Sequence, residues 1–286
     1  MRNSTPLFPP HAGRVCCLGP EATYSHAAAL AAFGNDAALC MERSIPRVFA
    51  QVESGACAYG IVPVENSIEG SVGVTLDSFG DTRCRICAEI CLEIEHLLLG
   101  RARTLAAILT VYSHPQALGQ CRDWIARHLP AAEVVPVSST AAAAEKALAD
   151  PTAAAIGGQM LRDRHALPVL AERIQDRPLN LTRFWILRLG ALNPPTGNDR
   201  TALRIALAHE PGSLYNCLRH FAESGVNLTR IESRPCPDTP FEYTFFVDVD
   251  GHPQTDPLHS ALTRAGAARH EIVVLGAYAR QSPVRA

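Results

Sequence analysis

The chain of 286 residues is 47% hydrophobic and 19% charged, with a formal net charge of −2. This composition predicts a folded protein of about two domains and excludes a disordered chain. The near-neutral balance, without a basic run, gives no reason to expect nucleic acid or a membrane surface as a partner.

The N-terminal segment lacks the apolar core of a secretory signal, and no stretch approaches about 18 consecutive apolar residues. We therefore expect a cytosolic protein. Of the 10 cysteines, Cys84, Cys87 and Cys91 come closest to ligand spacing. They fall in a predicted strand, which places Cys84 and Cys87 on opposite faces. Because no second pair follows to complete a tetrahedral site, we expect free core cysteines and no metal.

Short apolar strands alternate with helical stretches from residue 13 to residue 189. The expected strands are 15–18, 37–41, 59–64, 84–99, 109–112, 134–137, 153–156 and 184–189. The expected helices are 25–33, 44–53, 70–79, 115–129 and 140–149. This alternation is typical of an α/β sheet. Because it restarts after the long apolar segment, we expect two lobes with a cleft, with the chain crossing near residues 90–100.

A Pro/Gly/Asn linker at residues 193–199 precedes a different pattern. Strands are expected at 201–208, 226–233, 243–250 and 271–278, with helices at 214–222 and 257–265. The order βαββαβ is the ferredoxin-like unit. We therefore divide the chain into a two-lobed domain, residues 13–192, and an α+β domain, residues 200–280.

Four loop segments beside predicted strands look functional: residues 19–25, 65–71, 113–118 and 180–184. They are rich in hydroxyls, amides and helix starts, which bind carboxylates. No GxGxxG, Walker A, HExxH or GxSxG motif is present. The sequence predicts a site for a small anion and no cofactor.

The segments GPEATYSHAA, GIVPVENSIEGSVGVTLDSF, VYSHPQALGQC and NLTRF resemble the signature segments of prephenate dehydratases, in the same order. GSLYNCLRHFAESGVNLTRIESRP resembles the regulatory ACT domain of that family. The resemblance spans residues 14–278. It departs at Ala22, where the family usually has Gly, and at Ser213, where the family usually has Ala.

The resemblance implies a periplasmic-binding-protein-like (type II) catalytic domain of two lobes, followed by an ACT domain. It implies a lyase that removes the ring hydroxyl and one carboxylate of prephenate, giving phenylpyruvate, CO2 and water. It also implies inhibition by phenylalanine, the end product of the pathway, and assembly into a homodimer or homotetramer. Aromatisation drives the reaction, so the protein must supply positioning and a proton.

Thr182 is our first candidate for the donor to the departing hydroxyl, although it can equally begin a strand. Arg183 can pair with a substrate carboxylate or make a structural ion pair. Glu65 and His114 are further candidates for handling a proton, although a histidine before Pro115 is often structural. The remaining substrate-binding candidates, several of which can instead be helix caps, are Thr23, Ser25, Asn66, Ser67, Ser139, Thr140 and Phe184.

In the tail, the turn from the first strand to the first helix is where the resemblance places an amino-acid effector. The segment that ends in Glu-Ser-Arg-Pro completes this predicted site. The effector-binding candidates are Gly212, Ser213, Leu214, Asn227, Leu228, Glu232, Ser233 and Arg234.

Three other interpretations were weighed. A solute-binding protein has a similar two-lobed cleft but requires a signal sequence. An arogenate dehydratase would carry the same motifs, and the sequence does not separate the two substrates. A fused chorismate mutase needs a helical domain, for which the segment before Gly13 is too short.

Overall fold

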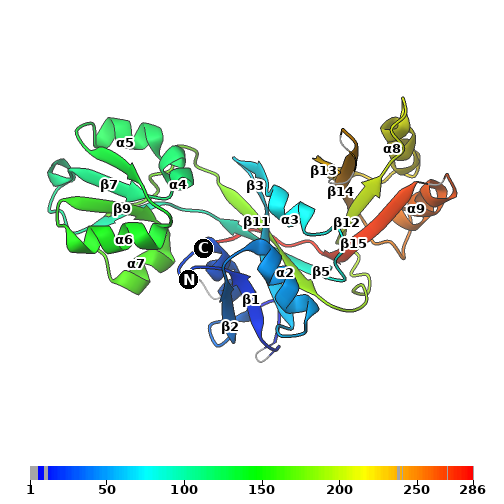
Figure 1. Cartoon of the computed structure of the whole chain (residues 1–286), viewed down its shortest axis with the longest axis horizontal. Helices are drawn as coiled ribbons and strands as arrows, with labels where there is room; N and C mark the ends of the chain where they lie inside the picture. Colours follow the sequence, from blue (N-terminus) through cyan, green and yellow to red (C-terminus); the bar gives the residue numbers. More distant parts are fainter. Residues whose placement is uncertain (1–5, 10–11, 237–238, 240, 269, 286) are drawn as a thin grey trace.

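The computed structural model describes residues 6–9, 12–236, 239, 241–268 and 270–285. Figure 1 shows three parts in a row, with the second lobe at one end, the first lobe in the middle and the C-terminal domain at the other end. No helix in the described part of the chain has the length and apolar character needed to cross a membrane.

The first lobe is an α/β sandwich built on part of a large sheet. Its strands run in the order β5-β11-β3-β1-β2. Helices α1 and α2 cover opposite faces, because Cys17 of β1 packs under α1 while Cys16 packs under α2. The helix expected at 70–79 is a short strand and a single turn instead. The elements are β1 (Val15–Leu18), α1 (Tyr24–Phe33), β2 (Leu39–Glu42), α2 (Ile45–Glu53), β3 (Tyr59–Asn66), β4 (Gly70–Ser71), α3 (Gly73–Asp77), β5 (Arg85–Glu93) and β11 (Leu181–Arg188).

The second lobe has its own sheet, in the order β10-β6-β9-β7-β8. The helix expected at 115–129 is broken at Cys121, whose backbone leaves the helical region. Helix α7 and strand β10 were not predicted. The elements are β6 (Leu97–Gly100), η1 (Leu105–Ala107), β7 (Thr110–Ser113), α4 (Pro115–Gln120), α5 (Arg122–His128), β8 (Glu133–Pro136), α6 (Thr140–Ala149), β9 (Ala153–Gly157), α7 (Gln159–His165) and β10 (Val169–Ala171).

The chain crosses between the lobes twice. The single strand expected at 84–99 is two strands, β5 and β6, because each half pairs in a different sheet. The outward crossing, residues 94–96, meets the return crossing before β11, where the Ile94 amide donates to the Asn180 carbonyl at 2.7 Å. The prediction that Cys84 and Cys87 face opposite sides of β5 is confirmed, since they pack in different cores. Every cysteine is free, and no three potential metal ligands gather among the described residues.

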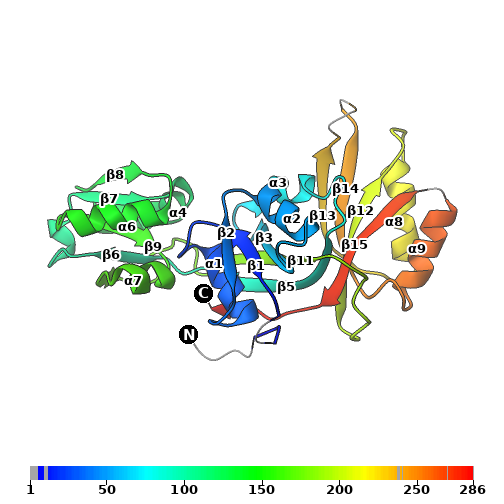
Figure 2. The same cartoon turned by 60° about the horizontal axis from the view of Figure 1, so that its bottom comes forward.

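The C-terminal domain has the predicted βαββαβ order, with strand order β13-β14-β12-β15. Helices α8 and α9 lie together on one face of this sheet (Figure 2). The sequence predicts a connection between the second and third strands of this domain. Residues 237, 238 and 240 of that connection lie outside the described residues. The elements are β12 (Asp199–Ala206), α8 (Ser213–Glu223), β13 (Leu228–Pro235), β14 (Tyr243–Asp250), α9 (Leu258–Ala267) and β15 (Glu271–Ala279).

The C-terminal sheet and the first-lobe sheet are continuous. Strand β15 pairs with β5 at Gly276 and Ile86, and a Cβ at Gly276 would lie 2.1 Å from the Ile86 carbonyl oxygen. After β15 the chain continues along β5 in the same direction, and β16 (Val284–Arg285) pairs in parallel with Leu92 and Glu93. The fold is therefore the predicted two-lobed domain plus a ferredoxin-like domain, joined through backbone pairing.

Candidate active site

A cavity of about 420 Å³ lies where the two lobes and their crossings meet. Residues from α1, β3 and β11 line one side, and residues from α4 and the start of α6 line the other. This is the cleft that the sequence predicts. The candidate residues that line it are Thr23, Ser25, Asn66, His114, Ser139, Thr140, Thr182 and Phe184.

Two helices from opposite lobes begin at the cavity. Thr23 caps α1, its hydroxyl accepting from the His26 amide at 3.4 Å, and Ser139 caps α6, accepting from the Ala142 amide at 3.1 Å. Ser25 is not the cap and lies buried in the first turn of α1. Since helix N-termini carry unpaired N–H groups and a partial positive charge, the cavity is suited to an anion at each side.

Alternation along β11 decides which motif residues reach the cavity. Thr182 and Phe184 line it, while Arg183 between them points to the other side of the sheet. On β3, the pairing skips Val64, because Arg183 pairs with Glu65 but Phe184 pairs with Pro63. This bulge brings both Pro63 and Asn66 to the cavity.

Three amide side chains connect Thr182 to the Glu69 carboxylate through hydrogen bonds. The Asn66 amide nitrogen donates to Thr182 Oγ1 at 2.8 Å and to Asn180 Oδ1 at 2.7 Å. The Asn180 nitrogen donates to Gln120 Oε1 at 2.9 Å, and the Gln120 nitrogen donates to Glu69 Oε1 at 3.1 Å. The series passes from the first lobe, through the return crossing, to α4 of the second lobe.

Both ends of this series fix its direction. The Glu69 carboxylate accepts, so Gln120 must present its nitrogen there and its oxygen to Asn180. At the other end, Asn66 Oδ1 accepts from the backbone amides of Ile68 at 3.0 Å and Glu69 at 3.1 Å. The Asn66 nitrogen must therefore face Thr182. The Thr182 oxygen then acts as an acceptor toward Asn66, which leaves its proton available to a ligand in the cavity.

A buried histidine joins the same series. His96 Nε2 lies 2.8 Å from Gln120 Oε1, and His96 Nδ1 lies 3.2 Å from the Tyr24 hydroxyl. Because Gln120 Oε1 is an acceptor, the proton of the neutral ring is on Nε2, while the Tyr24 hydroxyl beside Nδ1 donates to the Glu95 carbonyl at 3.0 Å. Burial lowers the pKa of His96 more than its hydrogen bond to the Gln120 oxygen raises it. Burial also raises the pKa of Tyr24 well above its ordinary value. Both groups are thus neutral near pH 7.

Three candidates lie outside the cavity. Arg183 and Glu65 form an ion pair at 2.9 Å on the opposite face of the sheet, because residues adjacent to Thr182 and Asn66 alternate to that face. Ser67 is exposed and exchanges hydrogen bonds with the backbone of Leu181, so it joins β3 to β11. Arg183 and Ser67, predicted to contact substrate, and Glu65, predicted to handle a proton, are therefore not among the residues that line this cavity.

His114 lines the cavity from the start of α4. It is exposed and caps this helix, with Nδ1 accepting from the Gln116 amide at 3.4 Å. No hydrogen bond links it to the series that ends at Thr182 among the described residues. The structure thus favours a capping role for His114 and keeps Thr182 as the better donor.

Sequence reasoning missed Tyr24, His96, Gln120, Asn180 and Glu69. All except His96 fall within the four motif segments, so the signal was present but was not assigned to side chains. His96 stands in the crossing, where no local pattern marks it. Its role follows only from contacts with residues distant in sequence.

In the C-terminal domain, a cavity of about 140 Å³ lies at the start of α8. Ser213 and Leu214 line it together with Leu207, Tyr243 and Phe245. Gly212 caps α8 in the left-handed region, with φ of 85°. Three predicted effector residues thus meet at one helix start.

The other effector candidates lie elsewhere. Asn227 is exposed and donates to Asp250 at 3.1 Å, and Leu228 follows it at the start of β13. Glu232 and Arg234 face the first lobe, where Glu232 accepts from Ser71 at 2.9 Å and Arg234 pairs with Asp77 at 2.7 Å. Ser233 points to the opposite, exposed side of β13. Glu232 and Arg234 therefore lie apart from the cavity at the start of α8 within one chain, and their part in an effector site between paired domains stays a prediction.

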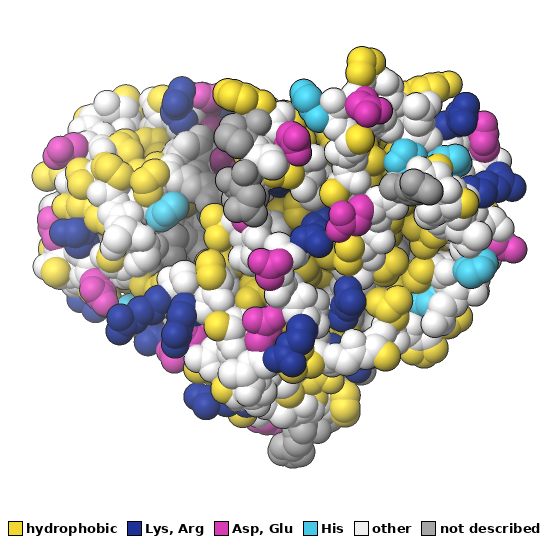
Figure 3. Space-filling model, turned by 45° about the vertical axis from the view of Figure 1, so that its right-hand side comes forward, with side chains coloured by type: hydrophobic (Ala, Val, Ile, Leu, Met, Phe, Trp, Pro, Cys, Tyr) yellow, Lys and Arg dark blue, Asp and Glu magenta, His cyan; other side chains and the backbone are white. Residues whose placement is uncertain are grey.

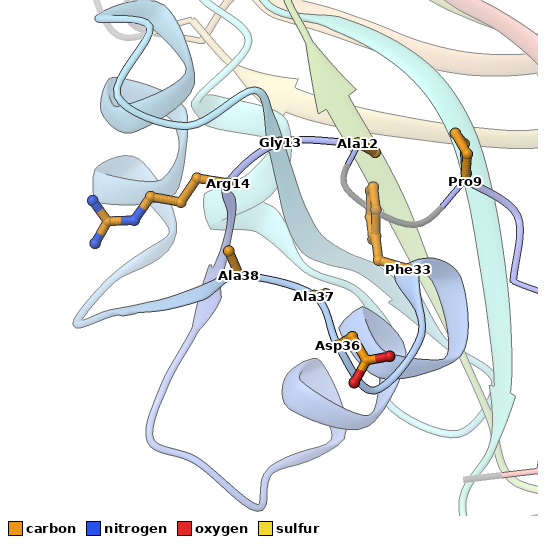
Figure 4. Close-up of a pocket in the computed structure, with 8 residues that line it drawn as sticks. All are labelled: Pro9, Ala12, Gly13, Arg14, Phe33, Asp36, Ala37 and Ala38. Carbon is orange, nitrogen blue, oxygen red and sulfur yellow. The ribbon is translucent and has the colours of Figure 1, made fainter.

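A further cavity, of about 240 Å³, lies beside the start of β1 and the end of α1. Its charged lining residues, Arg14 and Asp36, point in different directions in Figure 4. None of the predicted site residues lines it. Nothing in this arrangement converges on a ligand.

The cleft, its two helix starts and its oriented hydroxyl define a two-lobed α/β enzyme for a small anion, carrying a ferredoxin-like domain. The family model "Prephenate dehydratase" matches residues 15–191. The chain belongs to the prephenate dehydratase family. A bifunctional chorismate mutase/prephenate dehydratase of Stutzerimonas stutzeri is 43% identical over 93% of this chain and 73% of its own. A prephenate dehydratase of Mycolicibacterium vanbaalenii is 38% identical over 92% of this chain and 90% of its own.

Solved structures agree on the whole fold. A prephenate dehydratase of Arthrobacter aurescens in complex with L-Phe is 38% identical, with a TM-score of 0.85 over 96% of this chain and 93% of that one. A protein named GqqA, a quorum quenching acylase, is 28% identical, with a TM-score of 0.84 over 94% of this chain and 98% of that one. One fold thus accompanies two named activities, so the reaction must be argued from the site.

Proposed function

We propose that the cavity between the lobes is where this prephenate dehydratase converts prephenate to phenylpyruvate, CO2 and water. The observation that carries the proposal is the orientation of Thr182. Its oxygen accepts from Asn66, so its proton is directed to whatever occupies the cavity. A single preorganised donor of this kind is what the departing ring hydroxyl needs.

The charged and departing groups of prephenate match the groups that line the cavity. Prephenate is a dicarboxylate, and one helix start is available for each carboxylate. As the bond to the ring carboxylate breaks, its electron pair enters the ring and the ring hydroxyl leaves with a proton as water. Thr182 hydrogen-bonds that hydroxyl, while apolar contacts from Ile45, Val72 and Phe184 exclude water from the ring.

The lining favours prephenate over arogenate. Arogenate carries an ammonium group where prephenate has a keto group, and a buried ammonium needs a carboxylate partner. No Asp or Glu is among the described residues that line the cavity. We expect kcat/KM for prephenate to exceed that for arogenate by about 10- to 150-fold, from roughly 1.5–3 kcal/mol of unpaired charge. Side-by-side assays of both substrates test this, and equal values would contradict it.

Acyl transfer is less well supported by this site. An acylase needs a nucleophile paired with a base. Thr182 accepts a hydrogen bond from the Asn66 amide nitrogen, and His96 presents its protonated nitrogen to Gln120, so these residues do not form a nucleophile–base pair. Phenylpyruvate formation from prephenate, without acylase activity, is the expected outcome.

Phenylalanine is the effector we propose for the cavity at the start of α8. The cavity offers the N–H groups of a helix start for a carboxylate, and Leu207, Leu214 and Phe245 for a ring. The bound L-Phe of the Arthrobacter aurescens protein supports this choice. We expect inhibition of about 5- to 150-fold, the usual range of coupling between two sites.

Two substitutions at Gly212 distinguish steric crowding of the effector by a side chain from strain in the left-handed backbone. Asn tolerates the left-handed region that Gly212 occupies, whereas Val does not. We expect Gly212→Val to abolish inhibition without changing uninhibited kcat, and Gly212→Asn to weaken it through its side chain alone. Calorimetry with phenylalanine and rate assays measure both. Full inhibition in both variants would refute this location for the effector.

A homodimer, or a tetramer of dimers, is the assembly we propose. Strand β13 is an edge strand, and Tyr215, Ile231 and Tyr243 on this domain are 68%, 46% and 47% exposed. Figure 3 brings this end forward and shows hydrophobic side chains on its surface. A second copy would cover them and the unpaired strand edge. Sedimentation at micromolar concentration should show a dimer that Ile231→Lys weakens; a wild-type monomer would exclude it. The cytosolic location stays part of this proposal.

A further inference from the structure

Behind the catalytic residues lies a buried cluster of charges, which we call the rear cluster. It consists of Glu65, Glu89, Arg183, Arg200, Arg230 and Asp248. Arg183 lies at its centre, 2.5 Å from Asp248, 2.9 Å from Glu65 and 3.5 Å from Glu89. The Arg183 side chain is only 11% exposed and that of Asp248 is fully buried. None of these residues lines the cavity between the lobes.

The rear cluster is neutral only when the two domains are joined. The catalytic domain supplies Arg183, Glu65 and Glu89, a net charge of −1. The ACT domain supplies the opposite balance, since Arg230 pairs with Asp248 at 3.1 Å and Arg200 pairs with Glu89 at 2.8 Å. A buried ion that loses its partner is strongly unfavourable. The cluster therefore ties the position of the ACT sheet to the position of the Arg183 guanidinium.

Burial alone would lower the pKa of Arg183, but Asp248 and the nearby Glu89 outweigh it and the net pKa is raised. Burial alone would raise the pKa of Asp248, but Arg183 and Arg230 outweigh it and the net pKa is lowered. Both side chains therefore stay charged across the ordinary pH range.

A second contact reaches the strand that carries Asn66. Ser71 follows the loop that begins after Asn66, and β4 pairs Ser71 with Glu65. Its hydroxyl donates to Glu232 of β13 at 2.9 Å and accepts from Arg230 at 3.5 Å. The β13–β14 pair therefore supports both strands that end at the catalytic pair, β11 next to Thr182 and β3 next to Asn66.

We propose that Arg183 is a positioning residue for Thr182, and that the ACT domain completes the catalytic site from behind by holding Arg183 through Asp248. Arg183 does not touch substrate; it fixes the backbone of β11 at the neighbouring residue. The proposal rests on Thr182 being the catalytic donor, and it adds a dependence of kcat on a carboxylate in the regulatory domain.

The same strand also reaches the effector cavity. Tyr243 and Phe245 of β14 line that cavity on one face, while Asp248 lies three residues beyond Phe245 on the opposite face. An effector that shifts β14 thus moves the partner of Arg183. Such a ligand can alter catalysis only through a difference in affinity between the two positions of this strand.

The experiment measures Asp248→Asn in two backgrounds, the wild-type chain and Thr182→Ala. We expect Asp248→Asn to lower kcat by roughly 5- to 30-fold in the wild-type chain, with KM changed by less than about twofold. In Thr182→Ala it should cause no further loss, because the group that Arg183 positions is gone. An equal loss in both backgrounds, or no loss in either, would overturn the proposal. Near wild-type kcat in Thr182→Ala itself would instead refute the catalytic role of Thr182.

Asp77→Asn is the matched control. It removes an ion pair with Arg234 that also joins the ACT domain to the catalytic domain, but that is partly exposed and lies away from β11. The kcat of Asp77→Asn should equal that of the wild-type chain. A loss as large as that of Asp248→Asn would show that any weakened contact between the domains lowers kcat, and would contradict a specific role for Asp248. If Asp248→Asn does not fold, Arg183→Lys keeps the charge but loses the planar fork. Arg183→Lys should lower kcat less than Asp248→Asn does, and only in the chain that keeps Thr182. The same loss in the Thr182→Ala background would count against the proposal.

Discussion

The two faces of β11 differ in almost every physical property, although their residues alternate along one short strand. The front face, Thr182 and Phe184, meets a cavity lined by neutral amides and hydroxyls. The rear face, Arg183 and Trp185, is packed against charges and against Tyr278 of the ACT domain. The front face is built to receive a ligand and the rear face to hold another domain. Neighbours in a motif therefore need not share a binding partner.

The largest expected effect tests the front face directly. Thr182→Ala should lower kcat by about 10²–10³-fold, because one preorganised donor is lost. Thr182→Ser keeps the hydroxyl and should retain most of the activity. Initial rates of phenylpyruvate formation measure both, with circular dichroism as the check on folding. Comparable rates for the alanine and serine variants would show that the hydroxyl is not the donor.

A smaller effect should follow when the series that orients Thr182 is interrupted. Asn180→Ala leaves the amides of Asn66 and Gln120 without their partner, at a cost of about 1–3 kcal/mol for a buried polar group. We expect kcat to fall roughly tenfold. Asn227→Ala, which removes an exposed amide in the ACT domain, should leave uninhibited kcat unchanged. If both variants behave alike, the direction of the series has no bearing on catalysis.

The smallest expected effect is on stability, whose dependence on pH should differ between the two faces of β11. The pKa of His96, in the front series, is lowered by burial, so the unfolded chain binds more protons and stability falls as pH drops below about 6.5. The pKa of Asp248 in the rear cluster is also lowered, so its contribution is present above about pH 4 and is lost only below that value.

His96→Gln should remove the first of these losses and keep the second, since the glutamine amide can still donate to Gln120. Thermal unfolding between pH 3 and about pH 8 would resolve them. An unchanged profile in His96→Gln would mean that His96 is not the group responsible.

Local patterns were sufficient for most of the fold. Strand–helix alternation predicted the two lobes and the βαββαβ tail because each element buries one face. The breaks at residues 94–96 and at Cys121 were missed, since apolar residues recur on both sides of each break and only the surrounding sheets and helices decide where the segments divide. The helix start at Ser139 was recognised from cap chemistry, whereas the cap of α1 is Thr23 and not Ser25, the residue suggested by the sequence.

The site was harder to predict where geometry depends on distant residues. The alternation of β11 could have placed Arg183 opposite Thr182, but the bulge at Val64 and the carboxylate of Asp248 lie on other elements. Gln120 and His96 contact each other across 24 residues of sequence, and no periodic pattern encodes such a pair. Motif resemblance located the segments, and only the fold assigned their side chains.

The backbone pairing at Gly276 bears on how such a chain can be recombined. The linker at 193–199 looks like a natural place to exchange one regulatory module for another. However, the chain also leaves this domain through β15, beside Ile86, and then continues along β5 into the first lobe. An exchange would need two breakpoints, and the second would have to preserve a glycine, because a Cβ there would collide with the Ile86 carbonyl. A chimera joined only at the linker would leave an unpaired edge on its host. The ACT domain and the catalytic domain of this chain are therefore more readily inherited together than combined from separate proteins.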